Sequence, residues 1–106
     1  MICFYHELLV LPILRKWDTG IHLDCVNSCI EIFLDGTKLV GEGCIRHFAL
    51  SMDDVDESVK RVRNAGYKVS VDPKNVDMKT EPVFSIRVTF IEGPLHESIE
   101  LFCEKA

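Results

Sequence analysis

The sequence predicts an α+β fold made of two copies of one β-α-β-β-β module, the first copy without its opening strand. Stretches with helical spacing are each followed by stretches in which apolar residues alternate. Residues 29–33 read Cys-Ile-Glu-Ile-Phe and residues 98–102 read Ser-Ile-Glu-Leu-Phe, and each pentapeptide closes a helix and three strands. With 106 residues we expect a single domain, 1–106, with the truncated first module in 1–36 and the complete second module in 44–105.

The first half begins with a helical segment, 1–9, in which Phe4 and Leu8 fall on the buried side. Pro12 ends this segment, because proline cannot continue a helix. Strands separated by short turns are then expected at 13–17, 21–25 and 29–34. In the last strand the isoleucines share one face, so Glu31 lies on the other.

A glycine-containing linker, 35–43, leads into the second half, where a strand beginning at Cys44 hands over to a helix. Alternation puts Phe48, Leu50 and Met52 on the face under the helix, so His47 lies on the opposite face. Ser51 or Asp53 can cap the helix, and Gly66 stands where a left-handed residue is wanted at its end. The apolar positions at helical spacing are Val55, Val59 and Val62.

The remaining chain reads as three strands, of which the first covers 67–71. Residues 72–82 are polar and contain two prolines, so we expect them to form the longest loop. The second strand, 84–92, alternates, and the turn 93–97 leads into the last strand, 98–103. There Ile99 and Leu101 share one face and Glu100 lies on the other, where an unpaired charge avoids burial.

Composition excludes several classes of protein. The net charge of −5 leaves no basic stripe for nucleic-acid binding. No apolar run approaches the roughly 20 residues of a membrane span, and the apolar start lacks the basic region and cleavage site of a signal peptide. We expect a soluble, cytoplasmic protein.

The five cysteines are odd in number and scattered, without a pair of Cys-x-x-Cys spacings that would indicate a zinc site. We expect reduced and mostly buried thiols, which are the usual state of cytoplasmic cysteines. The acidic run 53–57 lacks the glycine and terminal glutamate of a calcium loop, and such charges commonly open a helix.

At this point the chain resembles the vicinal-oxygen-chelate superfamily of glyoxalase I, extradiol dioxygenases and fosfomycin-resistance proteins. The matching segments are His47-Phe-Ala-Leu with the following helix, Arg87-Val-Thr-Phe-Ile-Glu-Gly-Pro94, Ile99-Glu-Leu-Phe102 and, in the first half, Ile30-Glu-Ile-Phe33. The likeness is strongest to bacterial lactoylglutathione-lyase-like proteins. It implies two paired modules whose sheets curl around a cavity, with metal ligands on the first and fourth strand of each module.

Transferred to this sequence, the resemblance makes His47, Glu100 and Glu31 the metal ligands and Glu100 the catalytic base. The ligand on the first strand of the first module has no counterpart, since that position falls ahead of Met1 when the two halves are aligned. His22, one strand away from Glu31, is an alternative fourth ligand, although its strand is not a ligand strand of the family. Alone, His47 also fits a purely structural histidine.

A divalent zinc, nickel, manganese, cobalt or iron ion suits such ligands, and open positions let two adjacent substrate oxygens chelate it. The resemblance therefore implies a lyase or isomerase that acts on a small oxygenated substrate and stabilises an enediolate. The alternative is a non-catalytic protein of the same fold that binds a small molecule. Trp17, Phe33, Phe84 and Phe102 either wall an apolar pocket or belong to the core.

The absent opening strand also predicts a homodimer. Strand 29–34 then has an unpaired edge that is apolar on one face, and such an edge favours pairing with another chain.

Overall fold

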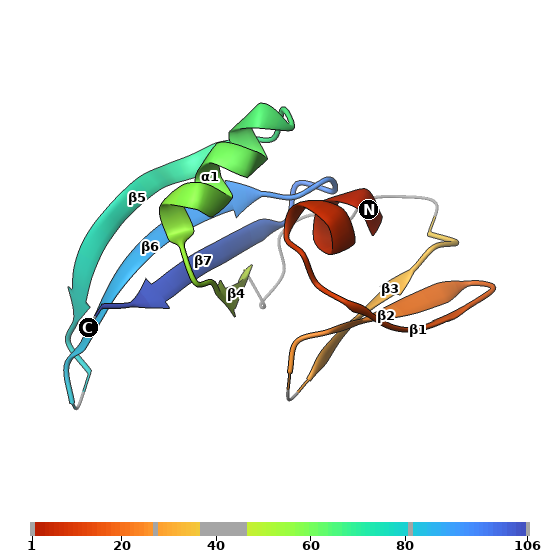
Figure 1. The fold of residues 1–106 in the computed structure, drawn as a ribbon, viewed down its shortest axis with the longest axis horizontal. Coiled ribbons are helices and arrows are strands. Elements are labelled where there is room, and N and C mark those ends of the chain that lie inside the picture. The colour runs from red at the N-terminus through yellow and green to blue at the C-terminus, as the bar shows by residue number, and fades with distance from the viewer. Residues whose placement is uncertain (1, 27, 37–46, 81, 106) are drawn as a thin grey trace. The chain divides into compact units, whose positions relative to one another are not determined.

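The computed structural model describes residues 2–26, 28–36, 47–80 and 82–105, so that residues 44–46 and most of the expected linker lie outside the described part. The chain divides into two compact units, Met1–Gly41 and Glu42–Ala106. Each unit contains its own sheet (Figure 1). No helix of the described residues is long and apolar enough to cross a membrane.

The first unit consists of a helix, η1, and an antiparallel sheet of order β1-β2-β3. The bounds are Cys3–Leu8 for η1, Ile13–Trp17 for β1, Gly20–Asp24 for β2 and Cys29–Phe33 for β3. These bounds confirm the expected elements to within one or two residues. The helix is wound as a π-helix, in which the Leu9 N–H donates to the Phe4 carbonyl five residues back.

Alternation gives the first sheet two different faces. The buried side chains Ile21, Leu23 and Ile32 share one face. His22 and Glu31, which are directly paired across β2 and β3, lie on the other face. The predicted orientation of Glu31 away from the core is thus confirmed.

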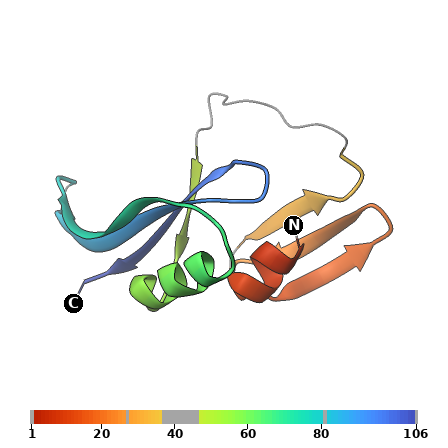
Figure 2. The ribbon, with the colours of Figure 1, turned by 90° about the horizontal axis from the view of Figure 1, so that it is seen from above.

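The second unit carries one helix, α1, and a mixed sheet of order β4-β7-β6-β5. The bounds are His47–Ser51 for β4, Val55–Asn64 for α1, Val69–Met78 for β5, Phe84–Glu92 for β6 and Ser98–Glu104 for β7. β4 runs parallel to β7, so the first and fourth strands of this module are neighbours, as the resemblance implied. Figures 1 and 2 show α1 on one face of this sheet, where it packs on β5, β6 and β7.

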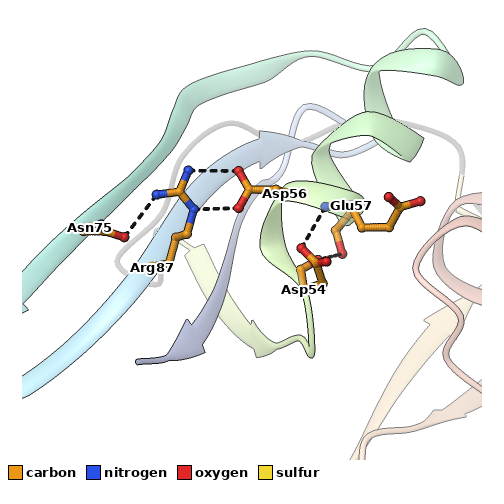
Figure 3. A network of polar contacts seen from close by, with 6 residues as sticks. Asp54, Asp56, Glu57, Asn75 and Arg87 are labelled. Atoms are coloured by element: carbon orange, nitrogen blue, oxygen red, sulfur yellow. Dashed lines mark hydrogen bonds and ion pairs between the residues drawn. The ribbon is translucent and has the colours of Figure 1, made fainter. Parts of the chain in front are cut away.

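The helix α1 is held by its apolar stripe, since Val55, Val59 and Val62 are buried as predicted. The predicted N-cap is wrong, because the capping residue is Asp54 rather than Ser51 or Asp53. The Asp54 carboxylate accepts the Glu57 N–H at 3.1 Å, the bond that satisfies an N–H of the first turn (Figure 3). Gly66 has the expected positive φ, +87°.

The predicted loop 72–82 is mostly strand. β5 continues through Pro73 to Met78, paired along its length with β6. Proline is tolerated because β5 is an edge strand and the pairing register shifts between Val71 and Lys74, which removes the need for a ladder N–H there. Nearby, the buried Thr89 hydroxyl donates to the Val71 carbonyl at 2.5 Å and holds the irregular strand to β6.

A polar clamp ties α1 to the sheet (Figure 3). The Arg87 guanidinium, on β6, donates to both oxygens of Asp56 in the first turn of α1, at 2.6 and 2.9 Å, and to Asn75 on β5 at 3.0 Å. The bond from Arg87 lowers the pKa of Asp56 below its ordinary value. The clamp also identifies the helix-covered face of β6, because alternation places Thr89 and Ile91 on the same face as Arg87.

Candidate functional site

The face of the second sheet that α1 does not cover, called the open face below although Ile86 and Val88 are buried on it, brings together two of the predicted site residues. His47 on β4 and Glu100 on β7 come from adjacent parallel strands, and the His47 Nε2 lies 3.3 Å from the Glu100 Oε1. Their side chains are 40% and 19% exposed, so that the pair is reachable from solvent while Glu100 is the more sheltered member. The neighbours of Glu100 on β7, Ile99 and Leu101, are fully buried on the helix-covered face.

Phe90 orients this pair. It stands directly opposite Glu100 across β6 and β7, on the open face. Its ring lies edge-on to the His47 imidazole, with centroids 5.2 Å apart and an interplanar angle of 83°. This arrangement is favourable for two aromatic rings and stabilises the imidazole in the orientation that it has beside the carboxylate.

The separation of His47 and Glu100 suits two ligands of one cation. A zinc ion binds histidine nitrogen and carboxylate oxygen at about 2.1 Å, and two such ligands at a tetrahedral angle are about 3.4 Å apart. The observed 3.3 Å matches this spacing and is longer than an ordinary hydrogen bond. The donor set, one imidazole and one carboxylate, is accepted by zinc, nickel, manganese, cobalt and iron. His47 and Glu100 therefore fit as two of the ligands of a divalent ion.

The third predicted ligand, Glu31, belongs to the first unit. There His22, its cross-strand partner on β2, places Nε2 at 2.6 Å from the Glu31 Oε1. On the other side of the ring, the Arg15 guanidinium on β1 donates to the His22 Nδ1 at 2.6 Å. Three neighbouring strands thus contribute one continuous chain of hydrogen bonds, which we call the Arg15–His22–Glu31 chain.

The sequence analysis did not predict this chain, although the pairing of β2 with β3 brings His22 and Glu31 together. The turn between β2 and β3 sets the register, and that register pairs His22 with Glu31. Within residues 2–26, 28–36, 47–80 and 82–105, no three His, Cys, Asp or Glu side chains gather in a metal-ligand cluster. The structure therefore assembles His47 with Glu100, and separately Glu31 with His22.

Aromatic side chains flank the first-unit chain. The Trp17 indole lies edge-on to His22, with ring centroids 4.9 Å apart and an interplanar angle of 79°. It also covers Gly20, where an added Cβ would stand 2.4 Å from the indole. Trp17 and Phe33 are 37% and 62% exposed, so neither is a core residue as the alternative interpretation expected.

A further charged group, Glu92, lies at the end of β6, next to the turn that leads into β7. Glu92 accepts from the His96 Nδ1 at 2.5 Å and lies 3.9 Å from the Lys68 ammonium. The bond from His96 lowers the pKa of Glu92 below its ordinary value. His96 is an exposed residue of this turn, so the contact is a surface interaction at one end of the sheet.

The expectation of mostly buried cysteines is wrong for Cys3 and Cys29. Both are exposed, while Cys25 and Cys103 are half-buried, and all four are free thiols. Exposure of Cys29 follows from its place at the start of an edge strand. Burial, with the negative charge of Asp24, raises the pKa of Cys25, so this thiol stays protonated. Cys44 lies outside the described residues.

Comparisons with known proteins agree with this architecture. The family model described as Glyoxalase/Bleomycin resistance protein/Dioxygenase superfamily matches residues 1–101. Curated protein sequences gave no match.

Solved structures share the fold at low sequence identity. A glyoxalase/bleomycin resistance protein/dioxygenase from Alicyclobacillus acidocaldarius has a TM-score of 0.67 at 18% identity, over 99% of this chain and 81% of that one. A glyoxalase family protein from Enterococcus faecalis has a TM-score of 0.67 at 20% identity, over 95% and 84%. Lactoylglutathione lyase from Agrobacterium tumefaciens has a TM-score of 0.62 at 19% identity, over 95% and 80%. These likenesses show the fold.

Proposed function

Because the chain belongs to the glyoxalase/bleomycin resistance protein/dioxygenase superfamily, we propose that it is a metal-dependent lyase or isomerase of the lactoylglutathione-lyase type. The proposed substrate is a small molecule with two adjacent oxygens. The observation that carries the proposal is the His47–Glu100 pair, with its 3.3 Å spacing on the open face of the second sheet. The similarity in fold to a lactoylglutathione lyase supports the reaction class.

In this proposal His47, Glu100 and Glu31 hold a zinc, nickel, manganese, cobalt or iron ion. When bound, such an ion supplies positive charge that stabilises negative charge on two neighbouring substrate oxygens. Three protein ligands are common in catalytic sites, which keep a position open for water or substrate.

Glu100 then acts as the base that removes a proton from the substrate carbon. Its carboxylate lies on the open face beside the His47 imidazole and is partly sheltered from solvent. The Glu100 side chain is 19% exposed, and partial removal of a carboxylate from water strengthens the electrostatic interactions that it makes. Removal of the proton by a carboxylate at this place is general base catalysis.

The experiment is an assay for formation and breakdown of S-lactoylglutathione with the protein loaded with each of the five metals in turn. We expect activity with one or two of them, and a loss of at least about 100-fold in kcat for Glu100→Gln, in line with the usual contribution of a general base. Lys105→Gln, close to the end of β7 in sequence, is the matched control and should keep wild-type activity. Full turnover by Glu100→Gln would refute the role of Glu100.

A second candidate function is non-catalytic binding of a small molecule. It is favoured by Trp17 and Phe33, large aromatic residues that are exposed in the first unit. Trp17 is the single tryptophan of the chain, so a ligand that contacts it should change the fluorescence directly. A saturable fluorescence change with a small oxygenated molecule, in protein that turns over no such molecule with any metal, would favour binding over catalysis.

We also propose that the protein is a homodimer that forms along β3. Among the described residues β3 pairs with β2 alone, which leaves its outer edge for another strand. Phe33 and Leu34 are exposed at the end of this strand, so that pairing with a second copy would remove apolar surface from water.

A further inference from the structure

The Arg15–His22–Glu31 chain assigns a role to a residue that lies outside the family's ligand strands. We propose that His22 is a positioning residue, which holds one oxygen of Glu31 and presents the other to the metal ion. This inference rests on the proposed function, in which Glu31 is the third ligand. It depends on which of the two ring nitrogens of the neutral His22 imidazole carries the proton.

The direction of each hydrogen bond in the chain follows from Arg15. A guanidinium has only donor groups, so the His22 Nδ1 at 2.6 Å must accept. The imidazole is then neutral and carries its proton on Nε2. This Nε2–H donates to the Glu31 Oε1, also at 2.6 Å. Arg15 thereby selects one tautomer of His22, and that tautomer is the one that can bind Glu31.

Two consequences follow for the metal site. His22 cannot itself be a ligand while Arg15 is in place, because both of its ring nitrogens are engaged and Nε2 is protonated. Glu31 has Oε1 engaged, so it offers Oε2 as a single-point ligand with a fixed direction. A carboxylate whose orientation is set by a second residue in this way generally binds metal more tightly than an unsupported one.

The corresponding position of the second module shows what His22 adds. His22 stands opposite Glu31 across β2 and β3, as Phe90 stands opposite Glu100 across β6 and β7. Phe90 has no polar atom, and Glu100 has His47 at 3.3 Å on its other side. In the first unit, by contrast, the ring opposite the glutamate is His22, which donates a hydrogen bond to Glu31.

Packing keeps the His22 ring in place. The Trp17 indole lies edge-on to it at 4.9 Å and rests on Gly20, which leaves room for the indole by having no side chain. The His22 side chain is 19% exposed, so the ring is largely shielded between Trp17, Arg15 and Glu31. The chain and Trp17 together are therefore a built arrangement of four side chains from three strands.

The first test reads the tautomer of His22 in metal-free protein at pH 8, by the nitrogen chemical shifts of the histidine ring in NMR spectra. We expect a proton on Nε2 and none on Nδ1. In Arg15→Met the donor to Nδ1 is lost, and His22 should become a mixture of both tautomers. Lys16→Met is the control, because it removes a positive charge from the next position of β1 and should leave the tautomer unchanged. A wild-type His22 with its proton on Nδ1 would overturn the hydrogen-bond chain.

The second test measures zinc affinity by calorimetry. His22→Phe keeps an aromatic ring beside Trp17 but loses the donor to Glu31, and we expect zinc affinity to fall about 10- to 100-fold. His22→Gln places an amide N–H near the position of Nε2, so it should recover most of the wild-type affinity. Equal affinity of His22→Phe and wild type, or no recovery by His22→Gln, would overturn the positioning role.

The two tests separate this inference from the proposed function. If wild type binds none of the proposed metals, the proposed function is refuted and the role of His22 toward a metal falls with it. If wild type binds zinc and His22→Phe binds it equally well, the metal site stands and the positioning role alone is refuted. In both cases the NMR measurement of the His22 tautomer still shows whether the hydrogen bond between Arg15 and His22 forms.

Discussion

Replacement of Leu101 by alanine should destabilise the protein by about 3 kcal/mol. The Leu101 side chain is fully buried on the helix-covered face of the second sheet. The change removes three carbons, and at about 0.8 kcal/mol for each the loss of hydrophobic transfer free energy is about 2.4 kcal/mol. The cavity adds to this loss, and measured values for such replacements lie at about 2–5 kcal/mol.

The neighbouring position gives the contrast. Glu100 points to the open face, so Glu100→Gln should change the free energy of unfolding by less than about 0.5 kcal/mol. Equilibrium unfolding in urea measures both variants, with the denaturant slope unchanged from wild type. A loss below about 1 kcal/mol for Leu101→Ala, or an equally large loss for Glu100→Gln, would refute this register of β7. A slip of one residue would exchange the two faces and place Glu100 in the core.

Three further predictions concern the clamp, the dimer and the packing at Trp17. Asp56→Asn should lower the melting temperature at pH 7. Because Arg87 lowers the pKa of Asp56, the stabilisation from this pair is present above the ordinary pKa of aspartate and is lost as pH falls through the lowered pKa of Asp56. The difference in melting temperature between Asp56→Asn and wild type should therefore shrink by pH 2. A constant difference from pH 7 to pH 2 would contradict this account. Phe33→Glu should convert a dimer into a monomer in analytical ultracentrifugation, and an unchanged dimer would contradict pairing along β3. Gly20→Ala should displace the Trp17 indole and shift its fluorescence emission maximum, since the added Cβ falls 2.4 Å from the ring; an unchanged emission maximum would argue against this packing.

Local signals in the sequence predicted most of the strands and the helix. The strands of the hairpins and α1 are indicated by patterns among residues close together in the sequence. The spacing of the valines of α1, for example, is visible without any tertiary contact. The N-cap was missed because several suitable residues stand close together, and the choice of Asp54 depends on where the backbone turns. β5 was missed because pairing with β6 overrides the turn preference of Pro73.

Local patterns in the sequence also pointed to some residues of the candidate site. Glu31 and Glu100 stand at the centre of repeated pentapeptides, and His47 was identified by alternation and resemblance. The Arg15–His22–Glu31 chain requires the register of two hairpins at once, since Arg15 pairs with His22 and His22 with Glu31. Neither residue belongs to a motif, so a pattern-based search gives them no weight.

In the proposed function, His47 and Glu100 are ligands of one divalent metal ion. The most direct test is metal content by mass spectrometry together with zinc calorimetry, on wild type beside His47→Ala and Glu100→Ala, with His96→Ala as the control. We expect one ion per chain in wild type and in the control, and loss of binding in both site variants. A wild type that contains none of the five proposed metals and does not bind zinc, or binding that survives both replacements, would contradict this assignment.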